Sequence, residues 1–203
     1  MENQTLAFIT SLIAMLLIMA SYFFKKKELY LLFQAAGMVF LIANYFFTLQ
    51  FVAMLGLVVG LFRALVFFFY ERKDKLAPIA WAFLFSALSI AAYFIAKELE
   101  GDNKPNNEFE WKGMILVVSL ALYAFIFRIR DLRLMRFTVL APTSLALLYN
   151  ILIRATQSSP FAILTYAFEL GANIVSILKY HVFGKEETKQ TEEPSKEKTY
   201  EEN

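Results

Sequence analysis

Long apolar runs, separated by short clusters of charge, are the feature that most constrains this chain of 203 residues. A helix needs about 20 apolar residues, rising 1.5 Å each, to cross roughly 30 Å of hydrocarbon. Stretches close to this length occur at residues 5–24, 29–49, 51–70, 76–96, 111–127, 137–153 and 161–178. We therefore predict an all-α, polytopic membrane protein with seven transmembrane helices, embedded in a lipid bilayer.

The composition narrows the chemistry that is open to the chain. Hydrophobic residues make up 59% of it and 22 residues are Phe, which is more apolar than soluble domains usually are. There is no Cys, which excludes disulfides and thiolate chemistry, and a lone His181 cannot build a metal site. The sequence contains no phosphate loop and no nucleophile with its base. We expect no enzyme activity, no metal, no cofactor and no nucleic-acid partner.

Lys and Arg are distributed unequally between the two sides of the predicted bundle. Arg63 lies inside a run, and four others, Lys97, Lys104, Lys112 and Arg154, fall on one side. The remaining fifteen fall on the other side: Lys25, Lys26, Lys27, Arg72, Lys73, Lys75, Arg128, Arg130, Arg133, Arg136, Lys179, Lys185, Lys189, Lys196 and Lys198. Because basic loops stay in the cytoplasm, we predict an outside N-terminus and a cytoplasmic C-terminus.

The first apolar run is predicted to be a retained helix and not a cleaved signal peptide, because its basic cluster follows it. Residues 97–110 carry five acidic side chains and form a predicted outer loop. Residues 184–203 are almost free of apolar side chains. Such a segment cannot bury enough surface to fold, so we expect a disordered cytoplasmic tail.

Several paired features indicate a duplicated three-helix unit. A basic–acidic–Leu turn follows the first run at 27–29 and the fifth at 130–132. Asn44 and Asn150 lie at similar depths, late in the second and sixth runs. Small residues spaced by four occur in the third and seventh runs, at Gly56 and Gly60 and at Ala167 and Gly171. We predict a bundle at 1–75, a linker helix at 76–96 and a second, parallel bundle at 111–183.

Two charged residues lie near the middle of apolar runs, Arg63 in the third and Glu169 in the seventh. A charge at that depth costs several kcal/mol unless it is paired or faces water, so each is a candidate for a functional site. Gly56, Gly60 and Arg63 share one helical face, which we expect to point inward. A polar stripe on the seventh run is formed by Thr165, Glu169, Asn173 and Ser176.

Two interpretations of these polar groups remain open. Arg63 and Glu169 are expected to be close enough to form a structural ion pair, with the asparagines making interhelical hydrogen bonds. Alternatively, the same groups line a translocation pathway or ligand site. Pro142 removes a backbone hydrogen bond from the sixth run and is a candidate hinge, with Gly37 in the second run as its counterpart.

Short segments at 25–29, 60–63 (Gly-Leu-Phe-Arg) and 171–175 (Gly-Ala-Asn-Ile-Val) resemble the YgjV family of bacterial inner-membrane proteins. That family is similar to the SWEET and PQ-loop transporter group. The resemblance implies a 3+1+3 helix arrangement in a bacterial cytoplasmic membrane, with paired polar residues on the third and seventh helices. Asn173 matches the Asn of that pattern. Gly60 stands where the pattern has Asn, and no Pro-Gln motif is present, so sugar specificity does not follow.

These features together predict a small transporter-like protein that moves a small polar solute by alternating access. Arg63 would bind an anionic group or pair with Glu169, and Asn173 would hydrogen-bond the solute, with Asn44 and Asn150 nearby. The alternative is a non-transporting receptor, accessory subunit or scaffold whose ion pair is purely structural. Self-association into a homo-oligomer is compatible with either.

Overall fold

The computed structural model describes residues 2–100, 111–153 and 160–183. Within these residues the chain is all-α and forms seven α-helices followed by a short π-helical segment, η1. The elements are α1 (Glu2–Ser21), α2 (Lys27–Phe47), α3 (Phe51–Arg72), α4 (Ile79–Glu100), α5 (Trp111–Ile126), α6 (Leu132–Ile153), α7 (Pro160–Ile177) and η1 (Leu178–Phe183). The predicted tail at 184–203 and most of the predicted acidic loop lie outside the described residues.

Two helix boundaries differ from the predicted runs by four or more residues. α4 continues to Glu100, past the predicted end at residue 96, and α6 begins at Leu132 instead of residue 137. The extra turn of α6 carries Arg133 and Arg136, whose charges had excluded it from an apolar run. Arg136 is nevertheless buried, because its guanidinium donates a hydrogen bond of 2.6 Å to the carbonyl of Phe24.

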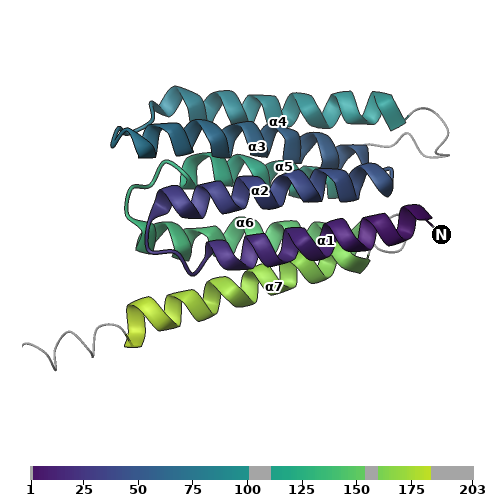
Figure 1. Cartoon of the computed structure of the whole chain (residues 1–203). Helices are drawn as coiled ribbons and strands as arrows, with labels where there is room; N and C mark the ends of the chain where they lie inside the picture. The colour runs from purple at the N-terminus through teal and green to yellow at the C-terminus, as the bar shows by residue number, and fades with distance from the viewer. Residues whose placement is uncertain (1, 101–110, 154–159, 184–203) are drawn as a thin grey trace, which may run out of the picture.

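The helices run up and down side by side, so that the turns after α1, α3 and α5 lie together at one end (Figure 1). Most of the described Lys and Arg residues lie in these turns, in the helix ends beside them and in η1. We call this end of the bundle the basic end. Consecutive helices pack on one another, α1 also packs on α7, and α3 packs on α5. Six helices therefore form a ring in the order α1, α2, α3, α5, α6, α7, and α4 packs outside it on α3 and α5.

The distribution of side chains over the bundle is that of a protein in lipid. Large apolar side chains cover its outside, including Leu16, Phe46, Phe62, Phe83 and Leu99. The interior, in contrast, holds buried charged and amide side chains. A water-soluble bundle would expose its polar groups and bury the apolar ones.

In the part of the chain that the structure describes, five helical segments are long and apolar enough to cross a membrane: Lys27–Phe47, Phe51–Arg72, Ile79–Leu99, Leu132–Leu152 and Ala162–Tyr180. Two further apolar segments, Thr5–Ser21 and Lys112–Ile126, are shorter. The chain is a multi-pass membrane protein by helix length and hydropathy. Seven crossings require that the two shorter segments also span.

Candidate functional site

The inward face of α3 positions the first charged group of the site. Gly56, Gly60 and Arg63 are all buried, as their helical spacing predicts. A Cβ at Gly56 would lie only 2.7 Å from Leu120 Cδ1, so the missing side chain is what lets α3 approach α5. This close approach brings Arg63 Nη1 within 2.5 Å of the backbone carbonyl of Leu120.

The guanidinium of Arg63 is packed between aromatic rings. Its Cζ lies 5.3 Å from the ring centroid of Tyr123 and 5.2 Å from that of Phe127, which are distances of cation–π contact. The residue is 1% exposed, and its Nε has no hydrogen-bond partner among the described residues. The ring faces offset part of the desolvation of the charge, but they do not neutralise it.

Glu169 is the second charged group and comes from the polar stripe of α7, whose four members are all buried. It is 3% exposed, and its Oε1 accepts hydrogen bonds from the hydroxyls of Tyr22 at 2.7 Å and Tyr123 at 3.4 Å. Tyr123 is in turn 2.6 Å from Thr143 Oγ1. The hydroxyls that donate to this carboxyl therefore come from the residue just after α1 and from α5.

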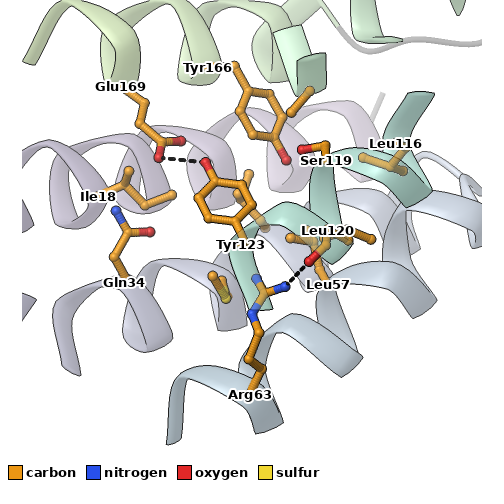
Figure 2. Close-up of a pocket in the computed structure, with 13 residues that line it drawn as sticks. Ile18, Gln34, Leu57, Arg63, Leu116, Ser119, Leu120, Tyr123, Tyr166 and Glu169 are labelled. Carbon is orange, nitrogen blue, oxygen red and sulfur yellow. Dashed lines mark hydrogen bonds between the residues drawn. The ribbon is translucent and has the colours of Figure 1, made fainter. Parts of the chain in front are cut away.

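Arg63 and Glu169 do not form the direct ion pair that the sequence suggested. Among the described residues the ion pair within 4.0 Å is Lys27 with Glu71, at the basic end. Tyr123 lies between the two charges, with its ring against Arg63 and its hydroxyl toward Glu169 (Figure 2). The reason is geometric: Arg63 extends toward the α5 backbone, whereas Glu169 extends toward the end of α1.

Both charges line one cavity at the centre of the ring, and its lining comes from all six ring helices. The polar side chains that line it are Gln34, Arg63, Ser119, Tyr123, Tyr166 and Glu169. The cavity volume is about 30 Å³, enough for two or three water molecules at roughly 10–15 Å³ each. Typical small-molecule sites have about 300–1,000 Å³, so this cavity is about ten times smaller than such a site.

The three asparagines of the predicted site are buried but do not line this cavity. Asn44 Nδ2 donates to the carbonyl of Ala7 at 2.6 Å, and Asn173 Nδ2 to that of Arg136 at 2.9 Å. Asn150 Oδ1 accepts from the hydroxyl of Tyr45 at 3.2 Å. These bonds join α2 to α1, α7 to α6, and α2 to α6. In this conformation the asparagines connect helices, and their role toward a solute stays a prediction.

The small residues of α7 do not pack as predicted. Ala167 and Gly171 are exposed, and a Cβ built on Gly171 would meet nothing within 4 Å. The polar stripe of α7 turns inward, which leaves the Ala167–Gly171 face on the outside of the ring. A close helix approach at a small residue is therefore observed at Gly56 of α3, whereas no described atom lies within contact of a Cβ built on Gly171 of α7.

The two predicted hinge residues have defined contacts. Gly37 is buried where α2 meets α1, and a Cβ there would lie 2.5 Å from Ile18 Cγ1, so close packing accounts for this glycine. Pro142 lies inside α6, and its carbonyl accepts a hydrogen bond of 2.8 Å from Ser119 Oγ. The hinge role of the two residues remains a prediction.

Sequence reasoning missed Tyr22, Tyr123 and Arg136. Tyr22 and Tyr123 supply the hydroxyls that contact Glu169. A Tyr inside an apolar run must place its hydroxyl against a polar partner. The position of Tyr123 within the run 111–127 could therefore have predicted a buried polar contact. Arg136 was counted as part of a cytoplasmic loop.

We compared the chain with protein-family models, with curated proteins and with solved structures, and found no match.

Proposed function

We propose that this multi-pass membrane protein moves a small polar solute across the bilayer by alternating access, through the cavity at the centre of the six-helix ring. The observation that carries the proposal is that Arg63 and Glu169, from different helices, line one cavity whose lining comes from all six ring helices. Ionisable groups at membrane depth mark solute or ion pathways when they face a shared interior space.

The arrangement of two three-helix units around a linker helix is part of this proposal. The packing of α3 on α5 corresponds to that of α7 on α1 if α5–α7 repeat α1–α3. The same 106-residue offset relates Asn44 to Asn150 (150 − 44) and Arg63 to Glu169 (169 − 63). Both observations support a parallel repeat with its axis along the membrane normal and with α4 outside.

We further propose the bacterial cytoplasmic membrane, with the basic end in the cytoplasm, on the basis of the charge asymmetry and the resemblance to the YgjV family. Alternating access requires the cavity to widen and to open toward each side of the membrane in turn. The two units would do this by rocking about the ring interfaces α3–α5 and α1–α7.

Introduced cysteines test this proposal directly, because the native chain has none. Met38 lines the cavity, whereas Ala82 on α4 is buried but lies outside the cavity lining. We expect a membrane-impermeant thiol reagent to label Met38→Cys in both right-side-out and inside-out vesicles, and to leave Ala82→Cys unlabelled. Labelling of Met38→Cys from neither side, or from one side only, contradicts alternating access.

A second candidate is a non-transporting receptor, accessory subunit or scaffold. It is favoured by the small cavity and by the engagement of Glu169 and the three asparagines with other protein groups. In that case Met38→Cys stays unlabelled on both sides while the protein remains folded.

A further inference from the structure

The guanidinium of Arg63 has hydrogen-bonding capacity that the described residues do not use. A guanidinium presents five N–H donors in a planar fork. Nη1 donates to the carbonyl of Leu120, whereas Nε has no partner among the described residues. The edge formed by Nε and Nη2 is the edge that holds a carboxylate through two parallel hydrogen bonds. No described Asp or Glu oxygen comes within 4.0 Å of this guanidinium.

The other polar groups around the cavity already have partners in the protein. Ser119 Oγ donates to the carbonyl of Pro142 at 2.8 Å, and Gln34 Nε2 donates to Ser21 Oγ at 3.1 Å. The hydroxyl of Tyr123 is held between Thr143 and Glu169. The unused donor at this site therefore belongs to a buried cation, and the missing partner is an anion.

We propose that the cavity beside Arg63 binds a small monocarboxylate, held in a bidentate manner by the Nε–Nη2 edge. The inference rests on the proposed function and deepens it by naming the class of solute. The cavity of about 30 Å³ matches an anion of a few heavy atoms, such as acetate. A hexose or nucleoside would not fit a cavity of this volume.

The charge of Glu169 should affect how tightly the cavity binds an anion. Its carboxyl lines the same cavity, so a negative charge on it opposes binding of a second anion. Glu169→Gln removes that charge while it keeps the size of the side chain and an oxygen acceptor. The variant is expected to bind acetate at a lower concentration than the native chain does.

The test is a thermal-unfolding titration of the purified full chain in neutral detergent, at fixed pH and ionic strength. Sodium acetate is the probe, and sodium gluconate, an anion too large for the cavity, is the reference. By linkage, acetate at about 100 times its Kd should raise the Tm by roughly 5–10 °C relative to gluconate. Arg63→Gln should abolish this shift, and Arg63→Lys should keep part of it, because the charge remains and the fork is lost.

Arg136→Gln is the matched control, because Arg136 is also a buried arginine with an unpartnered Nε but lies outside the cavity lining. It should leave the acetate shift unchanged. Phosphatidylglycerol, added separately, distinguishes a lipid headgroup from a free anion. Equal shifts with acetate and gluconate, an undiminished shift in Arg63→Gln, or a shift with the lipid alone would overturn the proposal. Because binding is measured without flux, an acetate shift beside an unlabelled Met38→Cys would refute transport and leave the anion site standing.

Discussion

At the scale of single residues, the hydroxyl of Tyr22 makes the shortest observed bond to Glu169, 2.7 Å against 3.4 Å for Tyr123. Tyr22→Phe removes this donor without opening a cavity. We expect a loss of about 1–2 kcal/mol in the free energy of unfolding, because a buried carboxyl oxygen loses its best partner. Reversible unfolding in mixed micelles measures it.

Tyr123→Phe provides the matched comparison, because it removes a hydroxyl whose bond to Glu169 is longer than a good O–H···O contact. In a background of Glu169→Ala, the cost of Tyr22→Phe should fall to near zero while that of Tyr123→Phe persists through its bond to Thr143. If Tyr22→Phe costs the same with and without the carboxyl, the bond to Glu169 contributes nothing to stability.

At the scale of elements, the three residues that follow α1 are held by hydrogen bonds from α6, α7 and η1. The carbonyls of Tyr22, Phe23 and Phe24 accept hydrogen bonds from Ser176 at 2.7 Å, Tyr180 at 2.8 Å and Arg136 at 2.6 Å. The backbone carbonyls of this turn have no partner in a regular helix, so the three side-chain donors satisfy them and tie the turn after α1 to α6, α7 and η1.

Arg136→Met removes the charged donor to the carbonyl of Phe24. The free energy of unfolding should fall by about 1.5–3 kcal/mol. The loss should be local, so amide hydrogen exchange is expected to speed up at residues 20–27 and to stay unchanged at residues 72–78. Arg128→Met is the matched variant, because Arg128 Nε donates to the carbonyl of Ala77 at 3.1 Å in the turn after α3. In Arg128→Met, hydrogen exchange should speed up at residues 72–78 and stay unchanged at residues 20–27. Identical exchange profiles for the two variants would contradict a local role of each arginine in its own turn.

Much of the element scale could be predicted from the sequence, because apolar length and helical spacing act within one helix. They predicted the inward faces of α3 and α7 correctly. What could not be predicted depends on contacts between helices. Arg136 and Lys27 looked like members of a solvated basic cluster, yet Arg136 holds the turn after α1 through the carbonyl of Phe24, and Lys27 is buried against Glu71. The position of Tyr123 between Arg63 and Glu169 likewise follows from how α5 packs against α3 and how its inner face meets Glu169 of α7.

At the scale of the whole molecule, α5 is the element on which the crossing number depends. Its 16 residues rise about 24 Å, which is roughly 6 Å less than the hydrocarbon thickness. A helix of this length spans only if the bilayer thins or if flanking side chains reach outward, as Lys112 at one end and Arg128 at the other can do. Its packing between α4 and α6 and against α3 favours a spanning orientation, because the neighbouring helices are long enough to cross.

Three single-cysteine variants decide this point: Asp74→Cys in the turn after α3, Asn106→Cys between α4 and α5, and Arg130→Cys in the turn after α5. With seven crossings and the basic end in the cytoplasm, an impermeant thiol reagent should label only Asn106→Cys in intact cells. The other two should react only after the membrane is opened. If Arg130→Cys is labelled from outside together with Asn106→Cys, α5 does not span, and the parallel repeat loses its fifth helix. If all three are protected in intact cells, α4 fails as well, and the ring of six helices cannot enclose a pathway between the two sides.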